Sequence, residues 1–143
     1  MNMRACCLFL SALTLSATAL AESSPPNAYL CVSDFSTGFR YDKEAKRWGP
    51  ATFRPSEKYL VSQKSANDKW QVKPVGTDYP MAYCDKGFNE SDILICDGVQ
   101  EFRFNRKLLR FVSVYMLGYY VLPSDGQEGG DTPNLIIGTC SSL

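Results

Sequence analysis

The 143-residue chain contains no histidine. This absence excludes Ser-His-Asp and Cys-His catalysis, histidine general bases and nearly all catalytic zinc sites, because each of them needs an imidazole. No two cysteines have the C-x-x-C spacing that redox-active pairs and many zinc sites use. A phosphate-cradling glycine loop of the Walker or dinucleotide type is also absent. The sequence therefore predicts no metal site, no cofactor and no enzymatic activity.

A hydrolase that uses two carboxylates needs no histidine and is the one enzymatic alternative. Nearly all of the candidate acids lie at predicted turns or on polar faces, where carboxylates are normally solvated, so we expect no such activity. By residue type they are Asp34, Asp42, Glu44, Asp85, Glu90, Asp92, Asp97 and Glu101.

The chain also has no excess of charge, with 15 basic and 15 acidic residues. Proteins that bind nucleic acid usually carry a basic patch, so this balance argues against a nucleic-acid partner. Beyond the N-terminal region, no apolar run reaches the roughly 20 residues that a membrane-spanning helix needs. We therefore expect no membrane span in the processed protein.

The N-terminus has the three parts of a secretory signal peptide. Arg4 precedes an apolar stretch over residues 5–20, and Ala19-Leu20-Ala21 is an A-x-A cleavage signature. Cleavage after Ala21 makes residues 1–21 a leader and leaves residues 22–143 as a single β domain. The sequence thus predicts a periplasmic or secreted protein.

Four cysteines remain after this cleavage: Cys31, Cys84, Cys96 and Cys140. An even number in an exported chain indicates two disulfides, for which three connectivities exist. The sequence alone does not choose among them. We favour Cys31–Cys140, which would tie the first strand to the last, and Cys84–Cys96, which would join neighbouring strands.

Short β-rich segments separated by turn residues predict an all-β fold, a single small antiparallel barrel or sandwich of about eight strands stapled by disulfides. Turn signals recur every 8–12 residues or so, and no helix-period stretch stands out. The expected segments are 29–33, 38–42, 47–53, 58–63, 69–75, 93–96, 99–105, 108–122 and 135–140.

Three local features refine this expectation. Asp97-Gly98 lies between two β-rich runs and predicts a type I′ hairpin, whose central residues take positive φ. Residues 108–122 predict one long strand with a bulge or bend at Gly118. Residues 123–133 are rich in glycine and acidic residues, which predicts a mobile loop before the last strand.

Alternation of aromatic and polar residues predicts which side chains fill the core. Phe39 and Tyr41 alternate with charged residues, as do Phe102 and Phe104, so we expect all four to be buried. Trp48 is expected to lie across from Phe39 or Tyr41 as a cross-strand pair.

Several blocks of the chain resemble a group of small exported proteobacterial proteins of unknown function. The similarity is scattered over most of residues 22–143 and implies an exported location, with no activity attached. The blocks are Tyr29-Leu30-Cys31, Ser36-Thr37-Gly38-Phe39, Lys46-Arg47-Trp48, Phe102-Arg103-Phe104-Asn105, Leu109-Arg110-Phe111, Gly118-Tyr119, Thr132-Pro133 and Ile137-Gly138-Thr139-Cys140-Ser141.

A weaker similarity is to the periplasmic inhibitors of C-type lysozyme. These inhibitors are small β-barrels with a terminal cysteine pair, and their inhibitory loops carry a Ser-Gly-x-x-Tyr-like element. Residues 36–41 are similar in composition, although Thr37 intervenes between Ser36 and Gly38. A strand entering from a turn would use the same residues structurally, with Gly38 relaxing the backbone, and we favour that interpretation.

The sequence favours a binding or inhibitory module of the periplasm. The alternative is a structural or envelope-interaction protein, recognised through a surface patch or a sheet edge. An envelope component, host lysozyme and a small apolar ligand are the candidate partners. The candidate binding residues are Ser36, Thr37, Gly38, Arg40, Trp48, Tyr119 and Tyr120.

Overall fold

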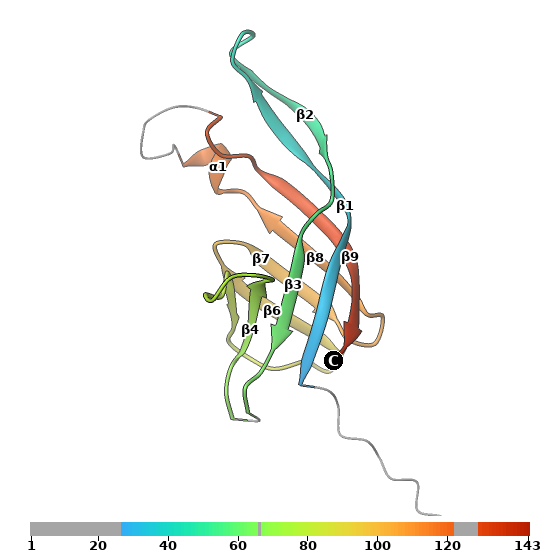
Figure 1. Ribbon diagram of the computed structural model, residues 1–143. Coiled ribbons are helices and arrows are strands. Elements are labelled where there is room, and N and C mark those ends of the chain that lie inside the picture. The colour runs from blue at the N-terminus through green and yellow to red at the C-terminus, as the bar shows by residue number, and fades with distance from the viewer. Residues whose placement is uncertain (1–26, 66, 122–128) are drawn as a thin grey trace, which may run out of the picture.

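The computed structural model describes residues 27–65, 67–121 and 129–143, so the expected leader, residues 1–21, lies outside the described residues. The described chain is nearly all β, as the sequence predicts (Figure 1). Its elements are β1 (Ala28–Asp42), β2 (Arg47–Phe53), β3 (Lys58–Ser62), β4 (Trp70–Pro74), β5 (Ala82–Cys84), β6 (Ile93–Gly98), β7 (Glu101–Asn105), β8 (Arg110–Tyr115), α1 (Leu117–Tyr120) and β9 (Asn134–Ser142).

Eight of the strands close into an antiparallel barrel. Neighbours run in the order β1, β3, β4, β5, β6, β7, β8, β9, and β9 pairs again with β1. Closure gives each of these eight strands a partner on both sides, which is the usual way that small all-β domains protect their strand edges. The strand β2 stands outside this ring, because among the described strands it pairs only with β1.

The first strand is longer than the barrel needs. Its first part pairs with β3 and its second part with β2, while β9 pairs along its other edge as far as Gly38. The sequence predicts two separate segments here, 29–33 and 38–42, but a register shift between Ser33 and Phe35 lets a single strand continue. The end of β1 and all of β2 therefore form a hairpin that projects beyond the barrel (Figure 1).

Aromatic side chains fill the barrel. Phe102 and Phe104 are both 0% exposed, which confirms their predicted burial. Phe102 stacks on Phe111 with 5.0 Å between ring centroids, and Tyr59 packs edge-on against both rings. The interior next to the projecting hairpin is more polar, because Ser33, Ser36 and Ser113 are buried there. The contacts among Tyr59, Phe102 and Phe111 show that aromatic side chains pack the centre of the barrel.

The other end of the barrel is closed by a second aromatic group. Phe88, from the loop after β5, packs edge-on against Trp70 and Phe104 at 5.1 and 5.8 Å. The Arg106 guanidinium lies 4.5 Å from the centroid of the Phe88 ring and forms an ion pair with Asp92 at 2.8 Å. Phe88 is thereby held over the end of the barrel as a plug.

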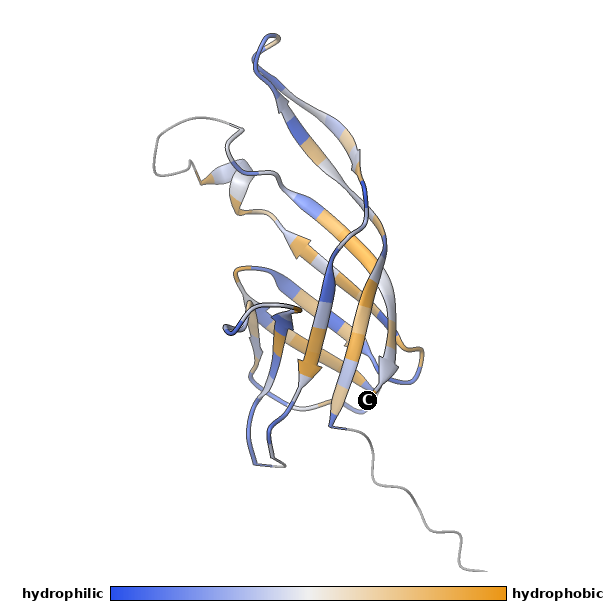
Figure 2. Ribbon diagram, viewed as in Figure 1, coloured by the Kyte–Doolittle hydropathy of each residue, from blue (hydrophilic) through white to orange (hydrophobic). Residues whose placement is uncertain are grey.

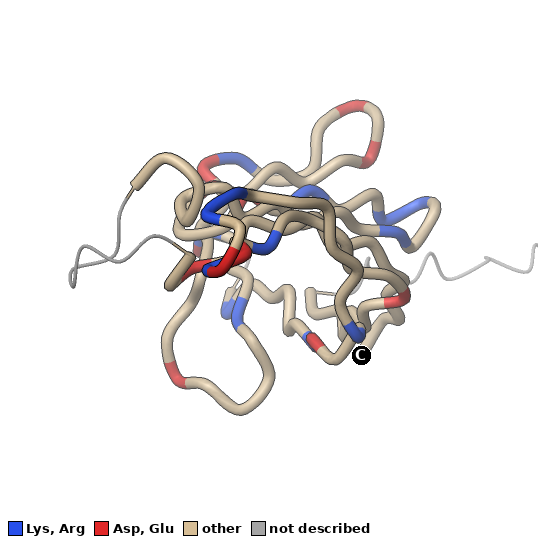
Figure 3. Tube along the Cα trace, turned by 90° about the horizontal axis from the view of Figure 1, so that it is seen from above, with Lys and Arg blue, Asp and Glu red and all other residues tan. Residues whose placement is uncertain are grey.

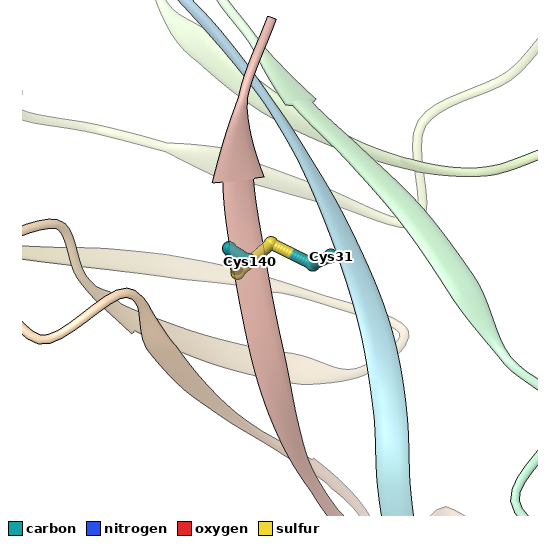
Figure 4. Close-up of a disulfide and its surroundings, with 2 residues drawn as sticks. All are labelled: Cys31 and Cys140. Carbon is teal, nitrogen blue, oxygen red and sulfur yellow. A yellow bond between two sulfur atoms is a disulfide. The ribbon is translucent and has the colours of Figure 1, made fainter.

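Both disulfides form as favoured. Cys31 of β1 bonds to Cys140 of β9, the two residues lying directly opposite each other across the seam that closes the barrel (Figure 4). Cys84 of β5 bonds to Cys96 of β6 around the loop that carries Phe88. The pairing is confirmed, and both bonds are buried.

The prediction of a type I′ turn at Asp97-Gly98 is wrong. Neither residue has a positive φ, and Gly98 continues β6 by pairing with Ala82. A Cβ at Gly98 would collide with the carbonyl oxygen of Met81. Glycine is therefore needed here because two strands approach closely, and the chain turns two residues later.

The prediction of one strand over residues 108–122 is also wrong. The strand β8 ends at Tyr115, and the chain turns into α1, where Gly118 is buried against the backbone of Asp131. Gly118 marks a change of direction, as expected, but not a bulge within a strand. No helix of the described residues is long and apolar enough to cross a membrane.

Candidate functional site

The projecting hairpin has two chemically different faces. Alternation along paired strands puts side chains of opposite residues on the same face. Phe39 lies opposite Pro50 and Tyr41 opposite Trp48, which makes one face aromatic. The tilted Tyr41 and Trp48 rings have centroids 5.5 Å apart, so the predicted cross-strand pair is confirmed.

The opposite face of the hairpin is basic, with small residues between the charges. Arg40 pairs with Gly49 and Arg47 pairs with Asp42. These residues line an open depression of about 530 Å³. The Arg40 guanidinium lies 5.6 Å from the centroid of the Phe53 ring, a distance typical of cation–π contacts.

An apolar groove lies where the aromatic face of the hairpin meets the barrel and α1. It consists of two adjoining depressions of about 370 and 350 Å³, which share three lining residues, Phe39, Met116 and Pro133. The remaining lining residues are Thr37, Gly38, Trp48, Pro50, Val114, Tyr119, Asn134 and Leu135. Ligand sites are typically concave and mostly apolar with a few polar groups, and this groove has that character.

The groove continues into a wider exposed surface, which we call the outer apolar face. Its members are Phe35, Phe39, Met116, Tyr119, Leu135 and Ile137, each between 40% and 70% exposed. Phe35 lies opposite Ile137 in the β1–β9 pairing, and hydrophobic segments extend along the upper part of β9 (Figure 2). Scattered single hydrophobics are normal on a protein surface, whereas a contiguous set indicates an interaction site.

The helix α1 is fastened to the segment before β9. The Tyr115 hydroxyl donates a hydrogen bond to the Asp131 carboxylate, and Gly118 packs against the same residue. Partial burial, followed by the hydrogen bond and negative charge of Asp131, raises the pKa of Tyr115 to about 12. Pro133 is fully buried, so the described end of the predicted loop is packed against the barrel, while residues 123–128 lie outside the described residues.

Alkaline pH should loosen this attachment. Because the pKa of Tyr115 is raised on folding, the hydrogen bond contributes fully below pH 10, the ordinary tyrosine value, and is lost as the pH approaches about 12. We expect Tyr115→Phe to lower the free energy of unfolding by about 1 kcal/mol at neutral pH. The difference from wild type should shrink above pH 10 in urea unfolding curves, and a difference that stays constant up to pH 12 would contradict the assignment.

The structure separates the predicted binding residues into two groups. Four of them line the groove: Thr37, Gly38, Trp48 and Tyr119. The Thr37 hydroxyl also donates to the Ala51 carbonyl oxygen at 3.1 Å. A Cβ at Gly38 would collide with the Pro133 carbonyl oxygen, which gives this glycine a packing role as well.

The other three predicted residues lie elsewhere. Ser36 is 5% exposed and faces the barrel interior. Arg40 is on the basic face of the hairpin, and Tyr120 is exposed on α1 without lining the groove. The Ser-Thr-Gly element is therefore part of a strand that leaves the barrel.

One prediction about this region is wrong and matters for the site. Alternation predicts Phe39 in the core, yet its side chain is 49% exposed, and Tyr41 is only half-buried. Both belong to the part of β1 that extends past the barrel, where the sheet is covered only in part. Gly129 packs against Tyr41 and the Tyr119 ring lies 5.8 Å from that of Trp48, while Phe39 stays half-exposed. No sequence pattern indicates Met116, Pro133 or Leu135 as lining residues, because they come from two segments that only the β8–β9 pairing brings beside β1.

Fold and site together define a class of protein: a closed β-barrel with aromatic side chains packed inside it, a projecting hairpin and an apolar groove outside the barrel. No cluster of three or more potential metal ligands occurs in the part of the chain that the structure describes. Comparison of the chain with family models, curated proteins and solved structures found no match.

Proposed function

We propose that the protein is a non-catalytic binding module of the cell envelope that recognises its partner through the outer apolar face and the groove within it. The supporting observation is the placement of Phe39. A large aromatic side chain that is 49% exposed, at the centre of an apolar groove, has no role in the barrel core. Two disulfides are typical of exported proteins and agree with a periplasmic or secreted location.

The packed interior favours recognition outside the barrel. Phe102, Phe104 and Phe111 occupy the space that a ligand would need inside, and Phe88 plugs one end. Protein interiors packed in this way have few voids larger than a water molecule. A small apolar ligand, if it binds, is therefore expected in the external groove.

A surface patch is a better candidate than a sheet edge. The free edge of β2 carries Pro50 at its centre, and proline has no backbone N–H to donate to an added strand. Strand addition along β2 would thus lose a main-chain hydrogen bond in the middle of a seven-residue strand. The outer apolar face needs no such backbone pairing.

Site-specific photo-crosslinking tests the proposal. Phe39 is replaced by p-benzoylphenylalanine, and Tyr83 of β5, which is 54% exposed across the barrel, is replaced in the same way as a control. After irradiation of intact cells, we expect adducts from position 39 and none from position 83. Equal labelling at the two positions, or none at position 39, would refute the proposed surface.

The crosslinked material also separates the candidate partners. An envelope protein, a lipid and lysozyme each give an adduct of different mass, which mass spectrometry resolves. A parallel assay of lysozyme activity with the purified protein tests the inhibitory alternative. We expect adduct formation at position 39 whichever of these partners the protein binds.

A further inference from the structure

The side chains of the outer apolar face share a feature that narrows the choice of partner. They lie on the outside of the barrel, in and around the groove, and the most exposed are aromatic: Phe35 at 70%, Tyr119 at 61% and the neighbouring Tyr120 at 68%. A rigid protein partner would need a matching concave surface for each of these side chains. A fluid lipid interface adapts to them without such complementarity.

The hairpin has the amphipathic arrangement of elements that lie in a membrane interface. Such elements bury an apolar face at the boundary between headgroups and acyl chains and keep Lys and Arg on the polar side. Here Phe39 and the half-buried Tyr41 and Trp48 occupy one face of the hairpin. Arg40 and Arg47 occupy the other face, together with Asp42 opposite Arg47. Tryptophan and tyrosine are also the residues enriched at membrane–water interfaces.

The net positive charge of the described residues comes from the hairpin. Between Ser36 and Phe53 there are four basic residues, Arg40, Lys43, Lys46 and Arg47, against two acidic ones. The Asp42 carboxylate accepts hydrogen bonds from the backbone N–H groups of Glu44 and Ala45 and is thus engaged in the turn. The other described residues hold ten basic and ten acidic side chains, on strands and loops around the barrel (Figure 3).

We infer that the partner of the outer apolar face is the surface of an anionic lipid bilayer, to which the protein binds peripherally. The hairpin and α1 would lie in the headgroup region, with Phe39 and Tyr119 directed towards the acyl chains and the basic side chains close to lipid phosphates. This inference rests on the proposed function, since it names the partner of the same surface. The exposed aromatic side chains contribute to the binding free energy by burying apolar surface in the bilayer. The basic residues provide the preference for anionic lipid.

Co-sedimentation with vesicles tests the inference. The purified disulfide-bonded protein is mixed with vesicles of phosphatidylglycerol and phosphatidylcholine, or of phosphatidylcholine alone. Each basic residue near an anionic surface contributes about 1 kcal/mol, so the hairpin excess of two charges predicts roughly thirtyfold stronger partitioning onto the anionic vesicles. This preference should disappear in about 1 M salt, where screening acts within about 3 Å.

Matched tyrosine variants test the orientation. Tyr119→Ala removes a side chain of the outer apolar face, and Tyr83→Ala removes one of similar exposure, 54% against 61%, on the far side of the barrel. Because the exposed ring would be removed from water in the interface, Tyr119→Ala should weaken partitioning about tenfold. Tyr83→Ala should leave it unchanged.

Matched charge variants test the electrostatic part. Lys43→Gln with Arg47→Gln neutralises two hairpin charges, and Lys107→Gln with Arg110→Gln neutralises two at the β7–β8 turn. The hairpin pair should abolish most of the preference for anionic vesicles, a loss of roughly thirtyfold, while the second pair should keep it. Thermal unfolding of all four variants establishes that each is folded.

Three results would overturn the inference. The first is no partitioning onto either type of vesicle, and the second is equal loss in the test and control variants. The third is a dimer in sedimentation equilibrium that Tyr119→Ala dissociates, because a second copy would then cover the face. If vesicles do not bind while position 39 still crosslinks to an envelope protein, the membrane inference falls and the proposed function stands.

Discussion

Removing the Cys31–Cys140 disulfide by a double substitution to alanine is expected to lower the free energy of unfolding by about 4–5 kcal/mol. The bond links residues 109 apart in sequence, so the chain that it closes includes almost the whole barrel. In the chain-entropy model a loop of about 100 residues contributes about 4.7 kcal/mol, because the crosslink restricts the unfolded state. The two strands that it joins also form the seam at which the barrel closes.

The second disulfide is the matched control for this experiment. Cys84 and Cys96 are also buried on neighbouring antiparallel strands, but they close a separation of only 12 residues. The same model gives about 3 kcal/mol for a loop of about 15 residues, so Cys84→Ala with Cys96→Ala should be less destabilising. Urea unfolding of both double variants measures the difference, and an equal or reversed order would show that loop length does not govern the effect.

The second large effect is expected from Phe102→Ala, which should lower the free energy of unfolding by about 3–5 kcal/mol. The side chain is fully buried between Tyr59 and Phe111, so its removal leaves a cavity in the centre of the barrel. Phe39→Ala makes the same chemical change in the projecting hairpin, where Phe39 is 49% exposed. We expect that variant to change stability by less than about 1 kcal/mol.

Comparing these two variants distinguishes a phenylalanine that stabilises the core from one that contributes to binding. Denaturant unfolding and crosslinking or vesicle binding are measured on both proteins. Phe39→Ala should keep the stability of the wild-type protein and lose binding. Phe102→Ala should lower the free energy of unfolding, and the molecules that remain folded should still bind. If Phe39→Ala were as destabilising as Phe102→Ala, Phe39 would be a core residue and the exposed groove would not be a recognition site.

Much of the barrel could be predicted from residue patterns. Phe102 and Phe104 alternate with polar residues on a strand that has one face on the core, and there period-two alternation reports burial directly. The two cysteine pairs could be favoured because an exported chain oxidises its thiols and because the first and last strands of a closed sheet must meet. The absence of histidine excludes histidine-dependent catalysis on composition alone, because no fold can supply a missing imidazole.

The same reasoning failed at positions where long-range contacts decide the environment. Phe39 and Tyr41 alternate as regularly as Phe102 and Phe104, but β1 extends beyond the barrel, where Gly129 covers Tyr41 in part and Phe39 stays 49% exposed. Gly98 follows aspartate, as in a tight hairpin, but is needed for the close approach of β5. Alternation predicts that one face differs from the other, and only the tertiary structure decides whether a face meets a core or solvent.

The sequence by itself determined an all-β, disulfide-bonded domain without histidine chemistry, because composition and local periodicity act through nearby residues. Only the tertiary structure decided that the barrel is filled, that one hairpin projects from it and that an apolar groove forms beside α1. That groove requires β1, β2, β8 and the start of β9 to meet. Its lining comes from segments nearly 100 residues apart in the chain, and such a meeting depends on how the barrel closes, which no local pattern encodes.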